Sequence, residues 1–513
     1  MAPGRDNGQQ KVKRIGILIV HGIGEQKQFE HLEAIASNLY RALNKDPNRK
    51  PHIQVRHGDQ LLRHSSEHTW REAPVRVRWQ AGSGDGIEVS LRETHWADLD
   101  LPMTWSRWFH LVGWALSVSG VQPFTRSNVE SSAMPGMTFP AQLSFWKLIP
   151  VRLKLFAVSL LFLLTLSSVD LLYALLVRFS FRAQFLKKIR GTLYDYLGDV
   201  KLYQDWFERK DETIEAVGDL SRVAIRRRMV RTLIQAAAEV ERGALDGYFV
   251  FAHSLGTVVA FNALMEHALT LPNYLTEDEW SALPSSFKKQ HTSPVPGEQM
   301  PRRPPWLGPT DAIDRDRLFS GLRGFLTWGS PLDKFAALWP AIVPVNLQPI
   351  PGNVPWINVA DTRDLVAGSL DLFPFDNGSP PRVGGLHLNN VVWADQTTPI
   401  SAHTRYWTSE PARDRLIDRL VPWLEGGQFV PPEDDASLCR TIGFAIFCVA
   451  VIAILATILG LEATGMIWIF ELGRHPGSIG RWMGIVLLAN ALVVLLCSLF
   501  RRVWEWKALR LPS

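Results

Sequence analysis

The strongest restriction on the fold comes from a single serine, Ser254, which stands where a strand pattern changes abruptly into a helix pattern. The apolar run Tyr248-Phe249-Val250-Phe251 is typical of a buried strand, and a helical pattern follows from Thr257 to Leu269. Between them the chain reads Ala252-His253-Ser254-Leu255-Gly256. Small residues two positions before and after a serine allow a tight turn that strains its backbone and exposes its Oγ. The segment predicts a nucleophile at the end of a strand, with an ordinary βα turn as the alternative.

A second turn, rich in glycine, follows the first apolar run of the chain. Residues Ile15 to Val20 form a β-branched run typical of a strand buried on both faces, and His21-Gly22-Ile23-Gly24 comes directly after it. An oxyanion hole needs N–H donors, and the N–H of the residue after a nucleophilic serine, here Leu255, is one of them. A glycine-rich loop after an early strand supplies the second, so Gly24 or Ile23 is the candidate. A plain β-turn is the alternative.

Strand and helix patterns alternate through much of the chain. Strand patterns recur at Val75 to Trp79, Ile87 to Leu91, Phe325 to Trp328 and Trp356 to Ala360. This alternation predicts an α/β fold with a doubly wound, mostly parallel sheet and helices on both faces. In such sheets the carboxyl ends of the strands meet at one edge, where ligands bind.

A serine nucleophile in this setting requires an acid and then a histidine base, in that order along the chain. Asp361 and Asp364 follow the last predicted strand, and Asp333 follows the strand before it, so all three are candidate acids. His403 is the candidate base, and His387 is its rival. The residues alone leave the choice of acid open.

These motifs resemble the lipase and esterase branch of the α/β-hydrolases, including bacterial members and relatives of the GPI inositol deacylases. The resemblance extends in order over roughly residues 12 to 425, with large insertions between the motifs. Two positions depart from the usual pattern, since Ala252 stands where glycine is commoner and Leu365 where proline is frequent. The matching segments are VHGIG (Val20 to Gly24), AHSLG (Ala252 to Gly256), TWGSPLDK (Thr327 to Lys334), WINVADTRDLV (Trp356 to Val366) and HTRYW (His403 to Trp407).

The resemblance implies catalytic roles for three residues. In that group the second aspartate of the late-strand motif usually carries the acid, which favours Asp364. The histidine before the Tyr-Trp pair is usually the base, which favours His403. Ser254 would attack an ester carbonyl, form an acyl-enzyme and pass the acyl group to water. This chemistry requires neither a metal ion nor an organic cofactor.

Long apolar blocks predict that the chain is integral to a membrane. Leu155 to Val177 is roughly as long as a bilayer crossing and carries one charge, whereas Thr441 to Leu461 and Trp482 to Phe500 carry none. We expect a hydrolase domain at 12–430 with a membrane insertion at about 105–180. A C-terminal transmembrane hairpin is expected at 438–505.

The orientation in the membrane follows from the parity of the crossings. The strands that end at His21 and Ala252 join one sheet, so the chain crosses the bilayer an even number of times between them. We therefore expect Trp108 to Val121 to cross together with Leu155 to Val177. The alternative is that Leu155 to Val177 lies in the interface or bends back near Ser167 to Asp170. Basic residues are denser outside the C-terminal hairpin than in its connection. This bias predicts an inner or plasma membrane protein with the catalytic domain and both termini in the cytoplasm.

Composition narrows the remaining function classes. The net charge of +5 is small for 513 residues, and the basic residues are scattered or lie beside apolar blocks. This distribution does not indicate nucleic acid as a partner. The three cysteines lie in or beside the C-terminal apolar blocks and no metal-binding motif is present, so neither a disulfide framework nor a metal site is expected. The Pro-rich stretch 283–315 is predicted to be a long loop, acting as a lid over the site or as a linker.

Three functions fit these patterns. A lipid-directed esterase, such as a lipase, phospholipase or deacylase, would draw its ester substrate from the bilayer. A tethered esterase or thioesterase would act on soluble substrates. A membrane scaffold that has lost activity but kept the hydrolase fold is the third, and the complete set of candidates for nucleophile, acid and base argues against it. The first function is the one we expect.

Overall fold

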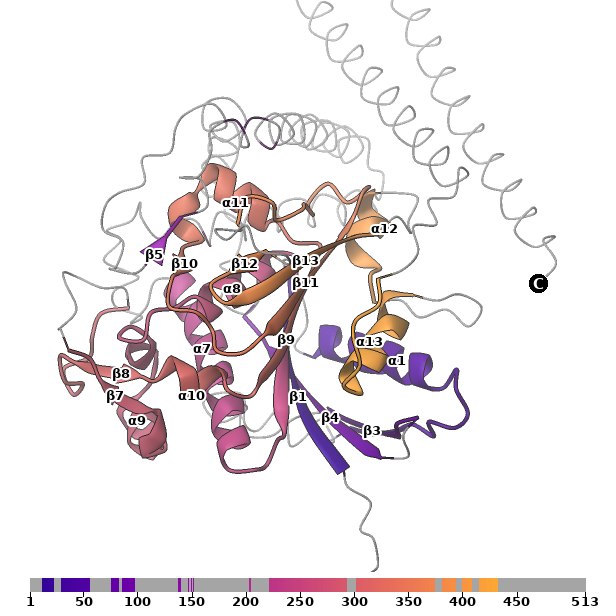
Figure 1. Cartoon of the computed structure of the whole chain (residues 1–513), viewed down its shortest axis with the longest axis horizontal. Coiled ribbons are helices and arrows are strands. Elements are labelled where there is room, and N and C mark those ends of the chain that lie inside the picture. The colour runs from indigo at the N-terminus through magenta and orange to yellow at the C-terminus, as the bar shows by residue number, and fades with distance from the viewer. Residues whose placement is uncertain are drawn as a thin grey trace, which may run out of the picture. The chain divides into compact units, whose positions relative to one another are not determined.

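The computed structural model describes the part of the chain that carries these motifs. The described residues are 12–22, 29–55, 75–82, 85–96, 137–139, 146, 149, 151, 203, 221–292, 301–373, 381–393, 399–407 and 415–431. The chain divides into two compact units, one of Met1–Val158 with Tyr194–Asp435 and the other of Ser159–Leu193 with Ala436–Ser513. All described residues, which are drawn in colour in Figure 1, belong to the first unit.

A nine-stranded sheet forms the centre of this unit, in the order β12-β13-β11-β9-β6-β1-β4-β3-β2 (Figure 1). The strands from β13 to β4 pair in parallel, whereas β12, β3 and β2 pair antiparallel at the two edges. The unit is therefore an α/β protein with a mixed, mostly parallel sheet. The strands are β1 (Val12–Val20), β2 (His52–Val55), β3 (Val75–Gln80), β4 (Gly86–Thr94), β6 (Gly247–His253), β9 (Leu322–Trp328), β11 (Val354–Asp361), β12 (Arg382–Val383) and β13 (Leu386–Trp393).

The strand patterns of the sequence are confirmed in β1, β3, β4, β6, β9 and β11. Strand β13, which pairs with β11, was not predicted, because Asn389 and Asn390 interrupt its apolar pattern. The Asn390 side chain has partners in the fold: it accepts hydrogen bonds from the Asn358 amide (2.9 Å) and the Leu370 N–H (3.1 Å). The Asn390 side chain thus links β13 to β11 and to the loop that follows β11.

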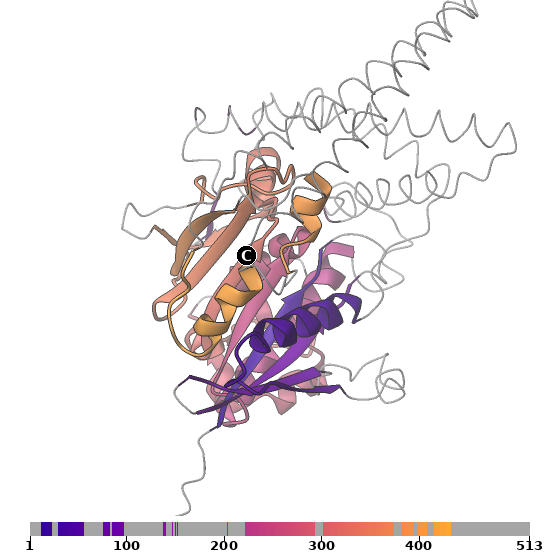
Figure 2. The same ribbon diagram turned by 90° about the vertical axis from the view of Figure 1, so that its right-hand side faces the viewer.

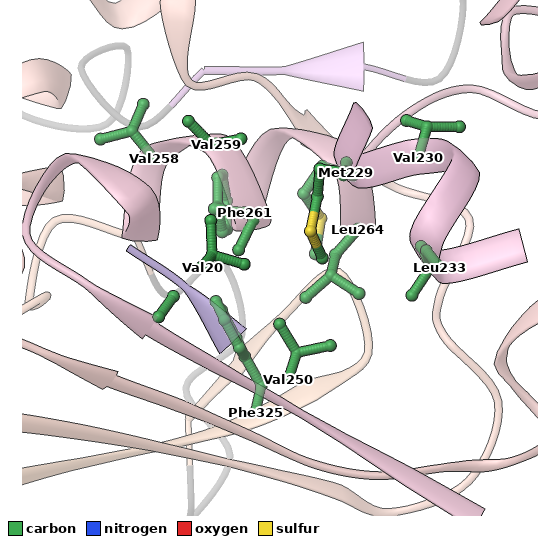
Figure 3. Packing of buried hydrophobic residues seen from close by; sticks show 14 of the residues in the cluster. Val20, Met229, Val230, Leu233, Val250, Val258, Val259, Phe261, Leu264 and Phe325 are labelled. Carbon is green, nitrogen blue, oxygen red and sulfur yellow. The ribbon is translucent and has the colours of Figure 1, made fainter. Parts of the chain in front are cut away.

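Helices cover both faces of the sheet, and two hydrophobic cores divide the strand residues between them. Leu18 of β1 and Val250 of β6 share one core with α7 (Ser221–Glu241), α8 (Leu255–Leu264) and α11 (Leu332–Leu338). Figure 3 shows Val250 of this core with side chains of α7 and α8. The next residues along each strand, Ile19 and Phe251, pack in the other core with α1 (Glu30–Leu43) and α13 (Leu416–Leu424). These two helices lie on the same face of the sheet (Figure 2). Because neighbouring side chains of a strand point to opposite faces, a sheet covered on both sides requires such uninterrupted apolar runs.

The Pro-rich stretch 283–315 contains regular structure where it is described. It forms the 3₁₀-helix η6 (Ser285–Phe287) and strands β7 (Lys288–Gln290) and β8 (Asp311–Ile313), which pair antiparallel, and α10 (Arg315–Phe319) begins at its end. Residues 293–300 lie outside the described residues. The other short elements are η5 (Leu271–Tyr274), α9 (Glu277–Ala282), η7 (Pro340–Ile342), α12 (Pro399–Thr404), and β5 (Met137–Thr138) paired with β10 (Val345–Asn346).

Two arginines attach this stretch to the C-terminal end of α8 and to the segment that follows it. The Arg303 guanidinium donates to the carbonyl of Leu269 (2.9 Å), and the buried Arg315 guanidinium donates to the carbonyl of Leu264 (3.1 Å). A cation at this end of a helix also complements the helix dipole. The serine turn lies at the other end of α8, about 15 Å away along the axis. The role of the stretch as a lid or a linker stays a prediction.

Among the described residues, no helix combines the length and the apolar character that a bilayer crossing requires. The blocks predicted to cross the membrane, 108–121, 155–177, 441–461 and 482–500, lie outside the described residues. The membrane insertion and the C-terminal hairpin therefore stay predictions from the sequence.

Candidate active site

The serine turn joins β6 to α8 at the carboxyl edge of the parallel strands. Ser254 has φ 51° and ψ −130°, a strained conformation that few non-glycine residues adopt. Its N–H donates to the carbonyl of Trp328 on β9 (3.1 Å), and its own carbonyl accepts from the Thr257 hydroxyl (2.7 Å). The neighbouring strand and the first turn of α8 thus hold the strained backbone in place.

Two glycines make room for this turn. A Cβ at Gly256 would lie 2.6 Å from the carbonyl oxygen of Val20, and a Cβ at Gly22 would lie 2.6 Å from Cβ of Ser254. Only glycine allows such a close approach of backbone to backbone. The turn after β6 therefore packs directly against the turn after β1. The small residue on the other side of the serine, Ala252, is fully buried within β6.

Ser254, His403 and Asp364 form one hydrogen-bonded chain. Nε2 of His403 lies 3.0 Å from the Ser254 Oγ, and its Nδ1 lies 2.9 Å from Oδ2 of Asp364. Three separate elements supply the side chains: the turn before α8, helix α12, and the loop after β11. The sheet brings these elements together, because β6, β9 and β11 run in parallel and end at the same edge.

The tautomer of the His403 imidazole follows from its partners. An ionised carboxylate only accepts hydrogen bonds, so the imidazole donates to Asp364 through its Nδ1–H. In the neutral ring Nε2 then carries a lone pair and accepts from the Ser254 hydroxyl. A histidine in this tautomer is arranged to take a proton from the serine.

The Asp364 carboxylate is fully buried and satisfied on both oxygens. Oδ2 accepts from His403 and from the Tyr406 hydroxyl (3.0 Å), and Oδ1 accepts from the N–H groups of Val366 (2.8 Å) and Ala367 (3.2 Å). Burial by itself opposes ionisation, but the charge of His403 and these hydrogen bonds together lower the pKa of Asp364 below its usual value. The group is therefore held as an anion. Sequence reasoning did not identify Tyr406 as a partner of the acid.

The other candidate acids make different contacts. Oδ1 of Asp361 accepts from the Arg363 N–H (2.9 Å), which shapes the loop that carries Asp364. Asp333, on α11, is buried in an ion pair with Lys334 (3.0 Å). Neither takes the place of Asp364 as the acceptor for the Nδ1–H of His403.

The rival base, His387, lies at the opposite edge of the sheet. It is the second residue of β13 and pairs with Pro355, near the start of β11. The carboxyl end of β13 is at Trp393, about 20 Å further along the strand. His387 is therefore separated from the serine turn by the length of the sheet.

The candidate oxyanion donors lie on the two adjoining turns. Leu255 is the first residue of α8, where the N–H groups have no acceptor within the helix and point out of its end. Ile23 and Gly24 lie outside the described residues, but the preceding Gly22 is held beside Ser254. His21 helps to fix that loop: its Nε2 accepts from the Trp96 N–H (3.0 Å), so its Nδ1–H donates to the Gly22 carbonyl (2.7 Å).

A buried histidine beside the serine completes the site. His253 precedes Ser254, and its ring packs 5.5 Å from Trp328 and 4.8 Å from His403, measured between ring centroids. Burial first, and then the charges of His403 and His31, lower the pKa of His253 well below its usual value. The ring is therefore neutral. Within the part of the chain that the structure describes, no cluster of three or more metal-ligating side chains occurs.

Comparison of the chain with protein-family models, with curated proteins and with solved structures finds no significant match.

Proposed function

We propose that the chain is a serine hydrolase of the α/β-hydrolase type that cleaves carboxylic esters. The observation that carries this proposal is the continuous hydrogen-bonded chain from the Ser254 Oγ through His403 to Asp364. A strained serine on a strand-to-helix turn, at the carboxyl edge of parallel strands, supports the same assignment. The order of the three residues along the sequence, Ser, Asp, His, also agrees with that class.

The proposed reaction has two steps. The Ser254 Oγ attacks the ester carbonyl carbon while its proton passes to Nε2 of His403. The tetrahedral intermediate then collapses: the C–O bond to the alcohol breaks, the alcohol leaves with the proton from His403, and the acyl group stays on Ser254. Water, deprotonated by His403, attacks the acyl-enzyme, and the returning proton releases the free acid and regenerates the serine.

Two further features would stabilise the charges that form during this reaction. The Asp364 anion faces the imidazolium that forms in each step, and its buried position strengthens their attraction. The N–H of Leu255, together with a donor from the loop after Gly22, would hold the oxyanion. One such donor is typically worth about 10²–10³ in rate.

We also propose that the enzyme is anchored in a membrane and draws lipid-type esters from it, as a lipase, phospholipase or deacylase does. This part rests on the apolar blocks of the sequence, which have the length of bilayer crossings. A tethered esterase for soluble substrates differs only in the shape of the acyl pocket. Incubation of the purified enzyme with a lipid extract, read by mass spectrometry, separates the two, because a lipid-directed enzyme releases fatty acid or deacylated lipid.

The test of the serine hydrolase proposal is Ser254→Ala. We expect loss of p-nitrophenyl ester hydrolysis by about 10³-fold or more, with expression and thermal stability unchanged. A fluorophosphonate probe should label the wild-type protein and not the variant. Retention of hydrolysis within a few-fold would remove Ser254 from the mechanism. Absence of labelling in the folded wild type would favour the inactive scaffold.

A further inference from the structure

Within the described part of the chain, the imidazole of His253 makes one directed hydrogen bond, and it goes to the backbone of the proposed base. Its Nε2 lies 2.9 Å from the carbonyl oxygen of His403. A carbonyl only accepts, so Nε2 carries the proton and donates. In the neutral ring Nδ1 is then bare, and this buried atom has no hydrogen-bond partner among the described residues. Among the described residues, the bond to His403 is therefore the only directed contact of this ring.

The carbonyl that accepts this bond belongs to the end of a short helix. His403 lies in the last turn of α12 (Pro399–Thr404). The carbonyl groups in the last turn of a helix have no N–H donor within the helix. The bond from His253 supplies a donor. It therefore joins the residue next to the nucleophile to the end of the helix that carries the base.

Packing leaves the His253 ring little freedom to move. Trp328 and His31 both lie nearly parallel to it, with centroids 5.5 and 5.7 Å away. Gly329, with φ +61°, brings its backbone against both histidines: a Cβ there would lie 3.1 Å from the His403 ring and 3.2 Å from Cδ2 of His253. The donor is thus held in one orientation before any substrate binds.

We propose that His253 is a positioning residue, a neutral hydrogen-bond donor that fixes the backbone of His403 and so aims its Nε2 at the Ser254 Oγ. This inference rests on the proposed function, because it assigns His253 to the same site. The neutral state of the ring, which burial causes, suits this role. His403 gains a proton in each step of the proposed reaction, and a second positive charge at a centroid distance of 4.8 Å would oppose that gain.

The matched pair His253→Gln and His253→Met tests the hydrogen bond separately from the packing. The two replacement side chains have similar length and volume, and both lose the aromatic stack, but only glutamine keeps an N–H donor near the position of Nε2. We expect His253→Gln to keep kcat within about tenfold of the wild type. His253→Met should lose a further 10-fold to 100-fold in kcat, because misplacing a reacting group by about 1 Å costs roughly that much. KM should change by less than about twofold in both.

The unfolding temperatures of both full-length variants show whether His253 has a merely structural role, because such a role would lower stability together with kcat. A lower kcat for the methionine variant at the same unfolding temperature as the glutamine variant supports positioning. Equal kcat values for the two overturn it. If His253→Met does not fold, His253→Phe replaces it, since this variant keeps the ring and loses the donor. A folded His253→Phe with wild-type kcat also overturns the inference.

Ser254→Ala, assayed beside these variants, separates this inference from the proposed function. Activity in Ser254→Ala contradicts the serine mechanism itself, whatever the His253 variants do. An inactive Ser254→Ala together with equal activities of the glutamine and methionine variants contradicts only the positioning role of His253.

Discussion

The Tyr406 hydroxyl donates a hydrogen bond to Oδ2 of Asp364, the oxygen that also accepts from His403. The same hydroxyl accepts from the N–H of Asp361 (2.8 Å). Tyr406 follows His403 by three residues, so one short segment supplies both the proposed base and a second donor to its acid. The end of β11 and the loop that follows it are thereby both tied to this segment.

Replacement of Tyr406 by phenylalanine should lower both activity and stability. The change removes a donor to a buried anion and leaves the Asp361 N–H without its acceptor, so we expect kcat to fall about tenfold and the free energy of unfolding by about 1–3 kcal/mol. Tyr203→Phe is the matched control, because the Tyr203 hydroxyl accepts from the Asn262 amide (2.7 Å) away from the serine turn. It should lose stability and keep kcat. A wild-type kcat in Tyr406→Phe would remove the tyrosine from the positioning of Asp364.

Asp364→Asn should damage hydrolysis far more than Asp361→Asn or Asp333→Asn. Asparagine keeps the shape but removes the charge that faces the imidazolium, a change that costs about 10⁴ in kcat in a comparable site. The other two variants should keep kcat within about tenfold while losing stability, because Asp361 shapes a loop and Asp333 pairs with Lys334. Steady-state kinetics on p-nitrophenyl esters compares the three. An inactive Asp361→Asn beside an active Asp364→Asn would reassign the acid.

Gly22→Ala should disrupt the serine turn, because Gly22 lies in the neighbouring turn after β1 and packs against Ser254. The added methyl would meet Cβ of Ser254 at 2.6 Å, and overpacking of this kind typically costs about 1–3 kcal/mol. We expect a lower unfolding temperature and a loss of fluorophosphonate labelling. Gly82→Ala is the control, since a Cβ there meets no atom within 4 Å. Unchanged labelling of Gly22→Ala would show that the two turns tolerate separation.

Stability should fall as the pH is lowered through the range in which histidine ordinarily titrates. Burial lowers the pKa of His31 to about 4 from an ordinary value of 6.5. Below pH 6.5 the unfolded chain therefore binds a proton that the folded chain does not, and the folded state loses stability until about pH 4. His253 acts in the same direction. The lowered pKa of Asp364 adds a second loss, below the ordinary carboxyl range, as the pH falls through its folded value.

Unfolding temperatures measured from pH 7.5 to pH 4.5 check this sign. His31→Phe keeps an aromatic ring and removes one titrating group, so its pH dependence should be flatter by up to about 3 kcal/mol across the window. A wild-type protein that becomes more stable on acidification would contradict the buried neutral state of these rings.

The proposed membrane topology predicts a labelling pattern on intact cells. After replacement of Cys439, Cys448 and Cys497, single cysteines at residues 6 and 511 should resist an impermeant maleimide, whereas one at Ser478 should react. The reason is that both termini are expected in the cytoplasm and the connection of the C-terminal hairpin outside it. Reaction at both termini with protection of Ser478 would invert the orientation.

The sequence by itself determined the strand and helix alternation and the position of the serine turn. Both are local: apolar runs such as Ile15 to Val20 match a strand covered on two faces, and the small residue Gly256 is needed because the turn contacts Val20. Patterns of this kind fail where a strand carries polar residues. Asn389 and Asn390 interrupt the apolar pattern of β13, and the Asn390 side chain finds its partner, Asn358, on another strand.

Only the tertiary structure decided which candidates meet. Asp361 and Asp364 are three residues apart and chemically identical, and the direction of the loop after β11 places only the second against Nδ1 of His403. His387 and His403 differ in the edge of the sheet at which they lie, which depends on the register of β13. The roles of Tyr406 and His253 likewise rest on contacts with residues 42 and 150 positions away, and a local pattern carries no information about such pairs.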